Sequence, residues 1–324
     1  MHAIRLHAHG PAENLAYEEV PDPVPAAGQV LVHVEAAGVH LIETRLRAGI
    51  AVGPHQPPAV PMTPGGEVAG VVGALGPGVD EHWLGRAVVA KLDAAGGYAE
   101  KAVARVEALH PLPAGLDAAT AVAIVTNGAT AQGVLRIAAP TPADTVLVMS
   151  AAGGLGSLFV QSARHAGATT VGAAGGTAKT DRVRALGADV AVDYRQPDWP
   201  DRVRAALNGR GATVVLDGVG GTLGRQALEL LEPGGRFLLH GWASGEPTAI
   251  TTQDLVARQL TATWALGPQS LPAGGHDELT ARALEEAAAG RWVPLMTRFP
   301  LSKAADAHAA LESRQAEGKV VLIT

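Results

Sequence analysis

The sequence predicts an α/β protein in which a doubly wound parallel sheet interrupts a second domain made of short strands. Three observations predict this class. A buried-strand pattern, Thr145–Met149, runs directly into the glycine-rich loop Ala151-x-Gly153-x-x-Gly156 and then an apolar helix. Strand and helix patterns alternate from there to about residue 264. Residues 1 to about 118 instead carry short strands separated by Pro- and Gly-rich turns.

The first segment predicts a compact, mostly antiparallel and barrel-like β domain. Val30–Val34 alternates as a half-buried strand does, and Glu67–Gly73 and Arg86–Lys91 are similar pieces. Gly76–Gly78 and the pair Gly96-Gly97 supply turns between them. Many short strands of this kind are typical of a barrel.

The second segment, 119–264, predicts a Rossmann-type sheet of six parallel strands. Ligands of such sheets bind at the carboxyl ends of the strands. The expected strands are Val146–Met149, Thr169–Ala173, Val190–Asp193, Thr213–Leu216, Arg236–Leu239 and Leu260–Trp264. The expected helices are Leu155–Ala166, Ala178–Leu186, Pro200–Leu207, Leu223–Leu231 and Thr252–Gln259.

The remaining segment, 265–324, is too small to fold alone. It contains a Gly/Pro-rich loop, an expected helix (Glu278–Ala289) and an expected last strand (Lys319–Ile323). We expect it to return to the N-terminal domain, so that 1–118 and 265–324 form one domain around 119–264.

Composition excludes several classes of function. The chain has 324 residues, 47% apolar and 17% charged, with a formal charge of −6. We therefore expect no nucleic-acid or anionic-membrane partner. The absence of cysteine excludes thiolate catalysis and Cys-ligated zinc and is compatible with a reducing compartment. The N-terminus lacks an apolar signal core, and no run approaches the ~20 apolar residues of a membrane span. These features predict a cytoplasmic protein.

The glycine loop predicts a dinucleotide site. Glycines let the backbone approach a pyrophosphate, and the following helix N-terminus offers free N–H groups and a positive dipole end. Gly167 is expected to end that helix. A tight turn without a ligand is the alternative.

The chain resembles the zinc-free quinone oxidoreductase branch of the medium-chain dehydrogenase/reductase superfamily over nearly its whole length. The resemblance implies a GroES-like β-barrel catalytic domain formed by both termini, an inserted Rossmann domain, and a homodimer or homotetramer. The matching pieces are Val30–Val39, Pro64–Val72, Gly97–Glu100, Thr126–Ala131, the glycine loop, Arg184–Asp189, Val215–Gly220 and Gly318–Leu322.

The position after the second strand of the inserted domain predicts NADPH as cofactor. An NAD site would carry Asp or Glu there, but the sequence reads Ala173-Ala-Gly-Gly-Thr177. In similar reductases a lysine in this loop and a tyrosine after the third strand hold the adenosine phosphate, and Lys179 and Tyr194 match them. Lys179 could instead be merely solvated. The full set of expected cofactor contacts is Ala151, Gly153, Gly154, Leu155, Gly156, Gly176, Thr177, Lys179, Tyr194, Gly218, Gly241, Trp242, Ala243, Ser244 and Lys319.

No metal site is expected. By the resemblance, zinc enzymes of the superfamily carry Cys near position 40, His within Pro64–Glu67 and Cys near the start of the inserted domain. This chain offers only His40 and Glu67 as possible ligands, whereas a catalytic zinc site usually has three protein ligands.

The chemistry without zinc is hydride transfer to an electron-poor acceptor. The protein must orient the acceptor and donate hydrogen bonds to the oxygen that gains charge. Similar quinone reductases read Gly-Val-Asn-x-x-Asp-x-Tyr where this chain has His40, Glu43 and Arg45. His40 is a candidate donor or proton relay, with a purely structural role equally open, and Glu43 a candidate for orienting it.

Thr126 and Asn127 are candidate contacts to the nicotinamide or the substrate by the same resemblance. An N-cap role for a helix starting at Gly128 is the local alternative.

The sequence therefore predicts an NADPH-dependent reductase of small quinones or α,β-unsaturated carbonyl compounds. The altered loop at 38–45 leaves two alternatives open. One is a specialised biosynthetic enoyl or enone reductase, and the other is a non-catalytic NADPH-binding protein.

Overall fold

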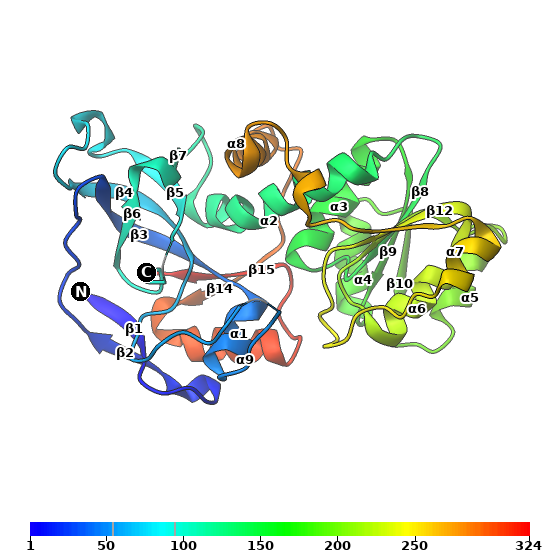
Figure 1. Ribbon diagram of the computed structural model, residues 1–324, viewed down its shortest axis with the longest axis horizontal. Coiled ribbons are helices and arrows are strands. Elements are labelled where there is room, and N and C mark those ends of the chain that lie inside the picture. The colour runs from blue at the N-terminus through cyan, green and yellow to red at the C-terminus, as the bar shows by residue number, and fades with distance from the viewer. Residues whose placement is uncertain (54, 94) are drawn as a thin grey trace. The chain divides into compact units, whose positions relative to one another are not determined.

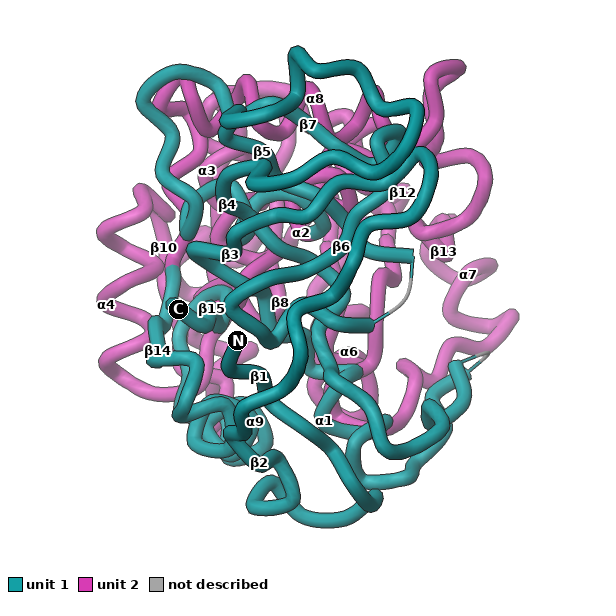
Figure 2. Tube along the Cα trace, turned by 90° about the vertical axis from the view of Figure 1, so that its left-hand side faces the viewer, with its two compact units in different colours: residues 1–126, 296–324 teal, residues 127–295 magenta. Residues whose placement is uncertain are grey.

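A computed structural model gives the structure of the protein and describes residues 1–53, 55–93 and 95–324. The chain forms two compact units. Unit 1 comprises Met1–Thr126 and Met296–Thr324, and unit 2 comprises Asn127–Leu295. Both ends of the chain belong to unit 1, drawn in teal in Figure 2, and unit 2 is one inserted segment.

Unit 2 is built on a six-stranded, fully parallel sheet, as predicted. Its strands pair in the order β10-β9-β8-β11-β12-β13, which is the doubly wound Rossmann order. The order reverses between β8 and β11, where ligands of such sheets bind. The strands are β8 (Thr145–Met149), β9 (Thr169–Ala174), β10 (Val190–Asp193), β11 (Ala212–Asp217), β12 (Leu231–Leu239) and β13 (Thr261–Trp264).

The predicted helices of unit 2 form between these strands, within one to two residues of the expected ends, and flank the sheet in Figure 1. The first of them buries Leu158, Phe159 and Val160, and Gly167, with φ +77°, lies just beyond its C-terminus as expected. The helices are α3 (Gly154–His165), α4 (Thr177–Ala185), α5 (Trp199–Ala206), α6 (Gly221–Glu229) and α7 (Thr252–Arg258).

Unit 1 carries a seven-stranded, mostly antiparallel sheet. The strands pair in the order β14-β15-β3-β4-β5-β7, and β6 also pairs with β3. Among the described residues of this sheet, the β14–β15 pair is parallel and the other pairs are antiparallel. These strands are β3 (Gln29–Val39), β4 (Glu67–Leu75), β5 (Ala87–Lys91), β6 (Lys101–Arg105), β7 (Leu109–Pro111), β14 (Met296–Pro300) and β15 (Lys319–Ile323). A separate two-stranded sheet pairs β1 (His2–Leu6) with β2 (Leu15–Glu19).

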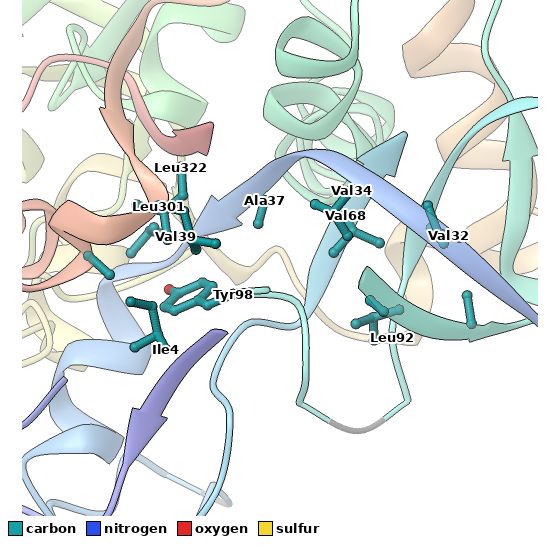
Figure 3. Packing of buried hydrophobic residues seen from close by; sticks show 14 of the residues in the cluster. Ile4, Val32, Val34, Ala37, Val39, Val68, Leu92, Tyr98, Leu301 and Leu322 are labelled. Carbon is teal, nitrogen blue, oxygen red and sulfur yellow. The ribbon is translucent and has the colours of Figure 1, made fainter. Parts of the chain in front are cut away.

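The core of unit 1 is an apolar cluster built around β3, the strand that pairs with β4, β6 and β15. Val32 and Val34 of β3 and Val68 of β4 are buried in one apolar cluster. Figure 3 shows the Tyr98 ring among apolar side chains of this cluster, including Ile4 and Val39. A fully buried tyrosine needs a hydrogen-bond partner for its hydroxyl, and the site described below supplies it.

Several elements of unit 1 were not predicted individually. They are the helices α1 (Leu41–Arg47) and α9 (Ala304–Glu312) and the strands β1, β2, β6, β7 and β14. No residue of β14 is buried and α9 is mostly alanine, so neither has a strong apolar period. Short 3₁₀ helices lie at Ala12–Asn14, Glu81–Trp83, Val106–Ala108, Pro268–Ser270 and Leu301–Lys303.

The expected domain boundaries at 118/119 and 264/265 differ from the units of the structure, which divide at 126/127 and 295/296. Residues 265–295, including α8 (Gly275–Ala288), belong to unit 2. The reason is direct bonding to α3. The Val293 N–H donates to Gln161 Oε1 at 2.8 Å, and the Trp292 indole N–H donates to Ser162 Oγ at 2.8 Å.

The helix α2 (Ala118–Ala138) corrects two expectations. It begins well before Gly128, so Thr126 and Asn127 lie inside it and do not cap it. Among the described residues, it is also long and apolar enough to cross a membrane, contrary to the expectation that no run is. About two thirds of its apolar window (67%) is buried within the protein, as in the core helix of a globular fold.

Candidate functional site

The loop between β8 and α3 holds the predicted glycines at the N-terminus of α3. A side-chain Cβ at Gly156 would lie 2.2 Å from the Ser150 carbonyl oxygen, so glycine is required for this close approach. The N-cap Gly153 gives the helix no side-chain cap, and Gly154, Leu155 and Gly156 form its first turn. Their N–H groups are the donors that an anion at a helix N-terminus uses.

The turn after β9 is tied to this loop and to the end of β10. The Ala151 N–H donates to the Ala173 carbonyl at 2.9 Å. Gly176, with φ +99°, is the N-cap of α4, so Thr177 and Lys179 lie in the first turn of that helix. A Cβ at Gly175 would lie 3.2 Å from the Tyr194 ring, which places that ring against the turn.

Asp193, at the end of β10, organises this turn and was missed by the sequence analysis. Its Oδ1 accepts the Gly176 N–H at 2.8 Å and the Arg195 N–H at 3.0 Å. Partial burial opposes ionisation, but these hydrogen bonds outweigh it and lower the pKa of Asp193. The Arg195 guanidinium lies where a side chain at Gly176 would be. Arg195 therefore adds a positive charge beside the segment that carries Lys179.

The loops that follow β11 and β12 are bonded to each other. The Ala243 N–H donates to the Gly218 carbonyl at 2.9 Å, and the Ser244 N–H donates to the Val219 carbonyl at 2.8 Å. A Cβ at Gly241 would lie 3.4 Å from the Gly218 oxygen. The predicted contacts Gly218 and Gly241–Ser244 are thus brought together at the carboxyl edge of the sheet.

Two buried groups beneath these loops were not predicted. Asp217 accepts the Val219 N–H at 2.8 Å and the Thr248 hydroxyl at 2.6 Å, which fixes the start of the first loop. Burial lowers the pKa of His240 to about 4 against the opposing charge of Asp217, so His240 is neutral at neutral pH. Above them Trp242 is exposed, and its ring packs against Trp264 with centroids 5.3 Å apart.

Unit 1 contains a second cluster of predicted residues, centred on the buried carboxylate of Glu67 at the start of β4. Glu67 Oε1 lies 2.5 Å from Lys319 Nζ and 3.0 Å from His40 Nε2. The Thr126 hydroxyl donates to Glu67 Oε2. Gly38 makes room for the carboxylate, because a Cβ there would lie 1.9 Å from Glu67 Oε1.

The charges of this cluster stabilise one another. Burial opposes ionisation of Glu67, but the charges of His40 and Lys319 outweigh it and hold its pKa well below the usual range. The side chains of Glu67 and Lys319 are almost fully buried, with 1% and 3% exposed, whereas 25% of the His40 side chain is exposed. Of these three side chains, His40 is thus the one with the most access to solvent.

Glu43 fixes the backbone of His40 at the start of α1. Its Oε2 accepts the His40 N–H at 2.7 Å and the Tyr98 hydroxyl at 2.7 Å. Burial and the nearby Glu43 charge raise the pKa of Tyr98 well above its ordinary value, so the phenol keeps its proton and donates it. His308 Nε2 lies 3.3 Å from the same hydroxyl. Glu43 thus holds the main chain of His40, while Glu67 and Lys319 hold its ring.

The predicted residues therefore fall into two groups. The expected nucleotide contacts other than Lys319 lie in unit 2. Lys319 joins His40 and Thr126 around Glu67 in unit 1, whereas Asn127 is half-buried in α2. The sequence analysis missed Glu67 as an organising group, although a charged residue at the head of the apolar strand Glu67–Gly73 was the available signal.

Over residues 1–53, 55–93 and 95–324, no three His, Cys, Asp or Glu side chains are grouped to hold a metal ion.

Comparison with known proteins places this geometry in a family. Residues 26–114 match the family described as "Alcohol dehydrogenase GroES-like domain", and residues 154–280 match "Zinc-binding dehydrogenase". A 2-haloacrylate reductase from a Burkholderia species is 34% identical, with 98% of this chain and 97% of that protein covered. The chain belongs to the quinone oxidoreductase branch of the medium-chain dehydrogenase/reductase superfamily.

Other members of this superfamily agree in sequence and structure. A quinone oxidoreductase of Pseudomonas aeruginosa is 31% identical, with 99% of this chain and 98% of that protein covered. The structure of Escherichia coli quinone oxidoreductase complexed with NADPH superposes with a TM-score of 0.87 at 29% identity, covering both chains completely. A structure named NAD-dependent alcohol dehydrogenase has the same TM-score at 30% identity, also with full coverage of both chains. The GroES-like and Rossmann assignments are thereby confirmed.

Proposed function

We propose that this medium-chain dehydrogenase/reductase is an NADPH-dependent reductase that delivers hydride to a quinone or an α,β-unsaturated carbonyl compound without zinc. The chain is an oxidoreductase with a small-molecule substrate. The finer terms of the proposal are the NADPH preference, the acceptor class and the absence of zinc.

The observation that carries the cofactor part is the turn after β9. No carboxylate stands in residues 173–177 at the end of that strand, and the carboxylate of Asp193, at the end of β10, is bonded to the Gly176 and Arg195 N–H groups. Lys179 places a positive charge in this segment, and the Arg195 guanidinium, ion-paired with Asp193, adds hydrogen-bond donors; both favour a 2′-phosphate over a free ribose hydroxyl. The uncapped first turn of α3 and its close glycines fit a pyrophosphate. When bound, NADPH would supply the hydride.

The acceptor part rests on unit 1. His40 is partly exposed and held by buried partners, so it can donate a hydrogen bond to an acceptor oxygen as that oxygen gains negative charge. A proton-bearing donor of this kind suits a quinone or an enone, whose carbonyl oxygen gains charge on hydride addition. The names of the Burkholderia and Pseudomonas relatives, 2-haloacrylate reductase and quinone oxidoreductase, support this class of electron-poor acceptor.

The test is NADPH consumption with a panel of a quinone, a linear enone, a cyclic enone, 2-chloroacrylate and a simple aldehyde, with NADH in parallel. We expect turnover of at least one quinone or activated alkene, with NADPH preferred and no loss after treatment with a zinc chelator. Tight NADPH binding without turnover of any acceptor would favour the non-catalytic alternative. Turnover of a single alkene acid would favour the specialised reductase.

Two further predictions concern the oligomeric state and the location of the protein. By family resemblance we propose a homodimer or homotetramer, which light scattering of the purified protein would measure. The lack of cysteine supports a reducing, cytoplasmic location.

A further inference from the structure

The amino group of Lys319 lies against two side chains of the kinds that bind zinc. Its Nζ is 2.9 Å from His40 Nε2 and 2.5 Å from Glu67 Oε1, and those two atoms are 3.0 Å apart. Imidazole nitrogen and carboxylate oxygen are both zinc ligands, and two atoms bound to one tetrahedral zinc are about 3.3 Å apart. His40 and Glu67 are thus spaced much like two ligands of one ion, and Lys319 Nζ lies close to both.

The amino group leaves no room for a metal ion on its side of this pair. An ion bound at about 2 Å from both ligand atoms on that side would be about 1 Å from Nζ. Despite burial, the pKa of Glu67 lies well below its usual range, in part because of the positive charge of Lys319. A charged amino group has no lone pair to offer a metal. Zinc, which the name of the second matching family implies, therefore does not fit these residues.

We propose that Lys319 is the residue that excludes a metal ion from this site, and that its amino group is the cation held by His40 and Glu67 in place of one. The inference rests on the zinc-free reaction of the proposed function and gives it a structural cause. It also assigns Lys319 a role other than the cofactor contact expected from the sequence.

The sheet of unit 1 fixes the three side chains relative to one another. Lys319 is the first residue of β15 and Glu67 the first of β4, and both strands pair with β3, which ends one residue before His40. The Thr126 hydroxyl donates to the other carboxylate oxygen of Glu67. Only 1% of the Glu67 side chain and 3% of the Lys319 side chain are exposed. A dissolved metal ion would therefore have to displace a buried, ion-paired lysine.

The direct test replaces Lys319 with a third ligand. A histidine side chain is shorter than a lysine side chain by about 2 Å, close to the length of a zinc–nitrogen bond, so Lys319→His should hold zinc near the present position of Nζ. With His40 and Glu67 it completes a set of two histidines and one glutamate, a known set of ligands for catalytic zinc. After incubation with zinc chloride and desalting, Lys319→His should retain about one more zinc per chain than the wild type.

The matched control is Lys319→His/Glu67→Gln, which has the same histidines but lacks the carboxylate. Its zinc content should equal that of the wild type, because it reports only zinc bound elsewhere on the chain. Cobalt chloride is the second probe. Co²⁺ in Lys319→His should give a visible absorption band that the control lacks, since nitrogen and carboxylate ligands accept several divalent metals.

Lys319→Ala covers the case in which the histidine variant folds poorly. It removes the charge that balances the buried Glu67, and a divalent ion should replace that charge. Zinc chloride should therefore raise the Tm of Lys319→Ala and leave the Tm of the wild type unchanged, because a ligand that binds only the folded state stabilises it. Lys319→Ala/Glu67→Gln has no buried carboxylate to balance and should show no such rise.

Two results would overturn the proposal. One is a wild-type protein that holds one zinc per chain and loses it in His40→Asn, because Lys319 would then not exclude the ion. The other is zinc binding by neither Lys319 variant beyond that of its Glu67→Gln control. Metal content is measured without any acceptor. A wild type that reduces no quinone or enone would therefore end the proposed function and leave the metal result in force.

Discussion

Asp193 Oδ1 accepts the amide N–H of Gly176 at 2.8 Å, which ties the end of β10 to the N-cap of α4. The carboxylate of Asp193 is thus engaged by the main chain and by the Arg195 side chain. We therefore expect the positive side chains of this segment, Lys179 and Arg195, to determine the preference between NADPH and NADH, rather than a carboxylate.

Replacing Lys179 should reduce the preference for NADPH. A charge-assisted hydrogen bond contributes about 1.5–3 kcal/mol, so Lys179→Ala should lower kcat/KM for NADPH by roughly 10- to 100-fold. The value for NADH should stay within about twofold, because NADH lacks the 2′-phosphate. Lys303→Ala is the matched control, since Lys303 is an exposed lysine of unit 1. Equal losses with both cofactors would contradict the phosphate role.

A negative charge at Gly153 should prevent cofactor binding. Gly153 is the N-cap of α3, where the dipole and N–H groups favour an anion. Gly153→Asp should raise the Kd of NADPH by about 100-fold or more through repulsion of the pyrophosphate. Gly153→Asn has nearly the same shape without the charge and should bind much more tightly than the Asp variant. Fluorescence titration with NADPH measures both, and equal affinities would argue against a pyrophosphate at this helix.

Replacing His40 should impair turnover more than cofactor binding. Loss of one donor to a developing oxyanion typically costs about 100- to 1,000-fold in kcat, and His40→Ala should approach the lower figure. His40→Asn supplies an amide donor and should recover part of the loss. The Kd of NADPH should be little changed in both variants. An unchanged kcat in His40→Ala would restrict His40 to a structural role.

Replacing Glu43 should lower the free energy of unfolding, because its carboxylate caps the N-terminus of α1. Its carboxylate accepts the His40 N–H and the Tyr98 hydroxyl, so Glu43→Ala leaves a buried phenol and a helix N-terminus without an acceptor. We expect a loss of about 1–3 kcal/mol in the free energy of unfolding. Glu43→Gln keeps an acceptor oxygen and should lose clearly less. Urea denaturation followed by circular dichroism compares them, and equal stability of all three proteins would refute the capping role.

Acidification should destabilise unit 1 through His308. Burial, and then the charge of Arg47, lower the pKa of His308 from 6.5 to about 3. The unfolded chain therefore binds a proton that the folded one does not. Stability due to the neutral ring should fall as pH drops from about 6.5 toward 3, by up to ~1.4 kcal/mol per pH unit.

His308→Gln removes this titration but keeps an N–H donor for the Tyr98 hydroxyl. The difference in unfolding free energy between the variant and the wild type should therefore change between pH 7 and pH 5, with the wild type losing more. Parallel pH profiles of the two proteins would show that His308 titrates normally. Each measurement uses the full chain, so other acid-sensitive groups such as His240 cancel in the comparison.

Local pattern was enough to predict the sheet of unit 2. The β8 strand is buried on both sides and has no polar alternation, and its glycine loop and α3 follow without interruption. Each of these features depends on residues close together in the sequence, so it can be predicted without knowledge of the tertiary structure. The partly exposed strand β14 and the alanine-rich α9 lack such a period and were missed. The boundary at 295/296 was missed for another reason, because the bonds of Trp292 and Val293 to α3 join distant segments.

The sequence by itself determined the class of protein. It shows a glycine loop between a strand and a helix and a β9 end without a carboxylate. It also has His40 and Glu43 in a loop where the family that it resembles usually has an amide and a shorter acid. Only the tertiary structure decided what those side chains do. Pairing of β15 and β4 with β3 brings Lys319 and Glu67 to the ring of His40. The groups packed against a histidine ring determine what it can bind, and here those groups come from strands far apart in the chain.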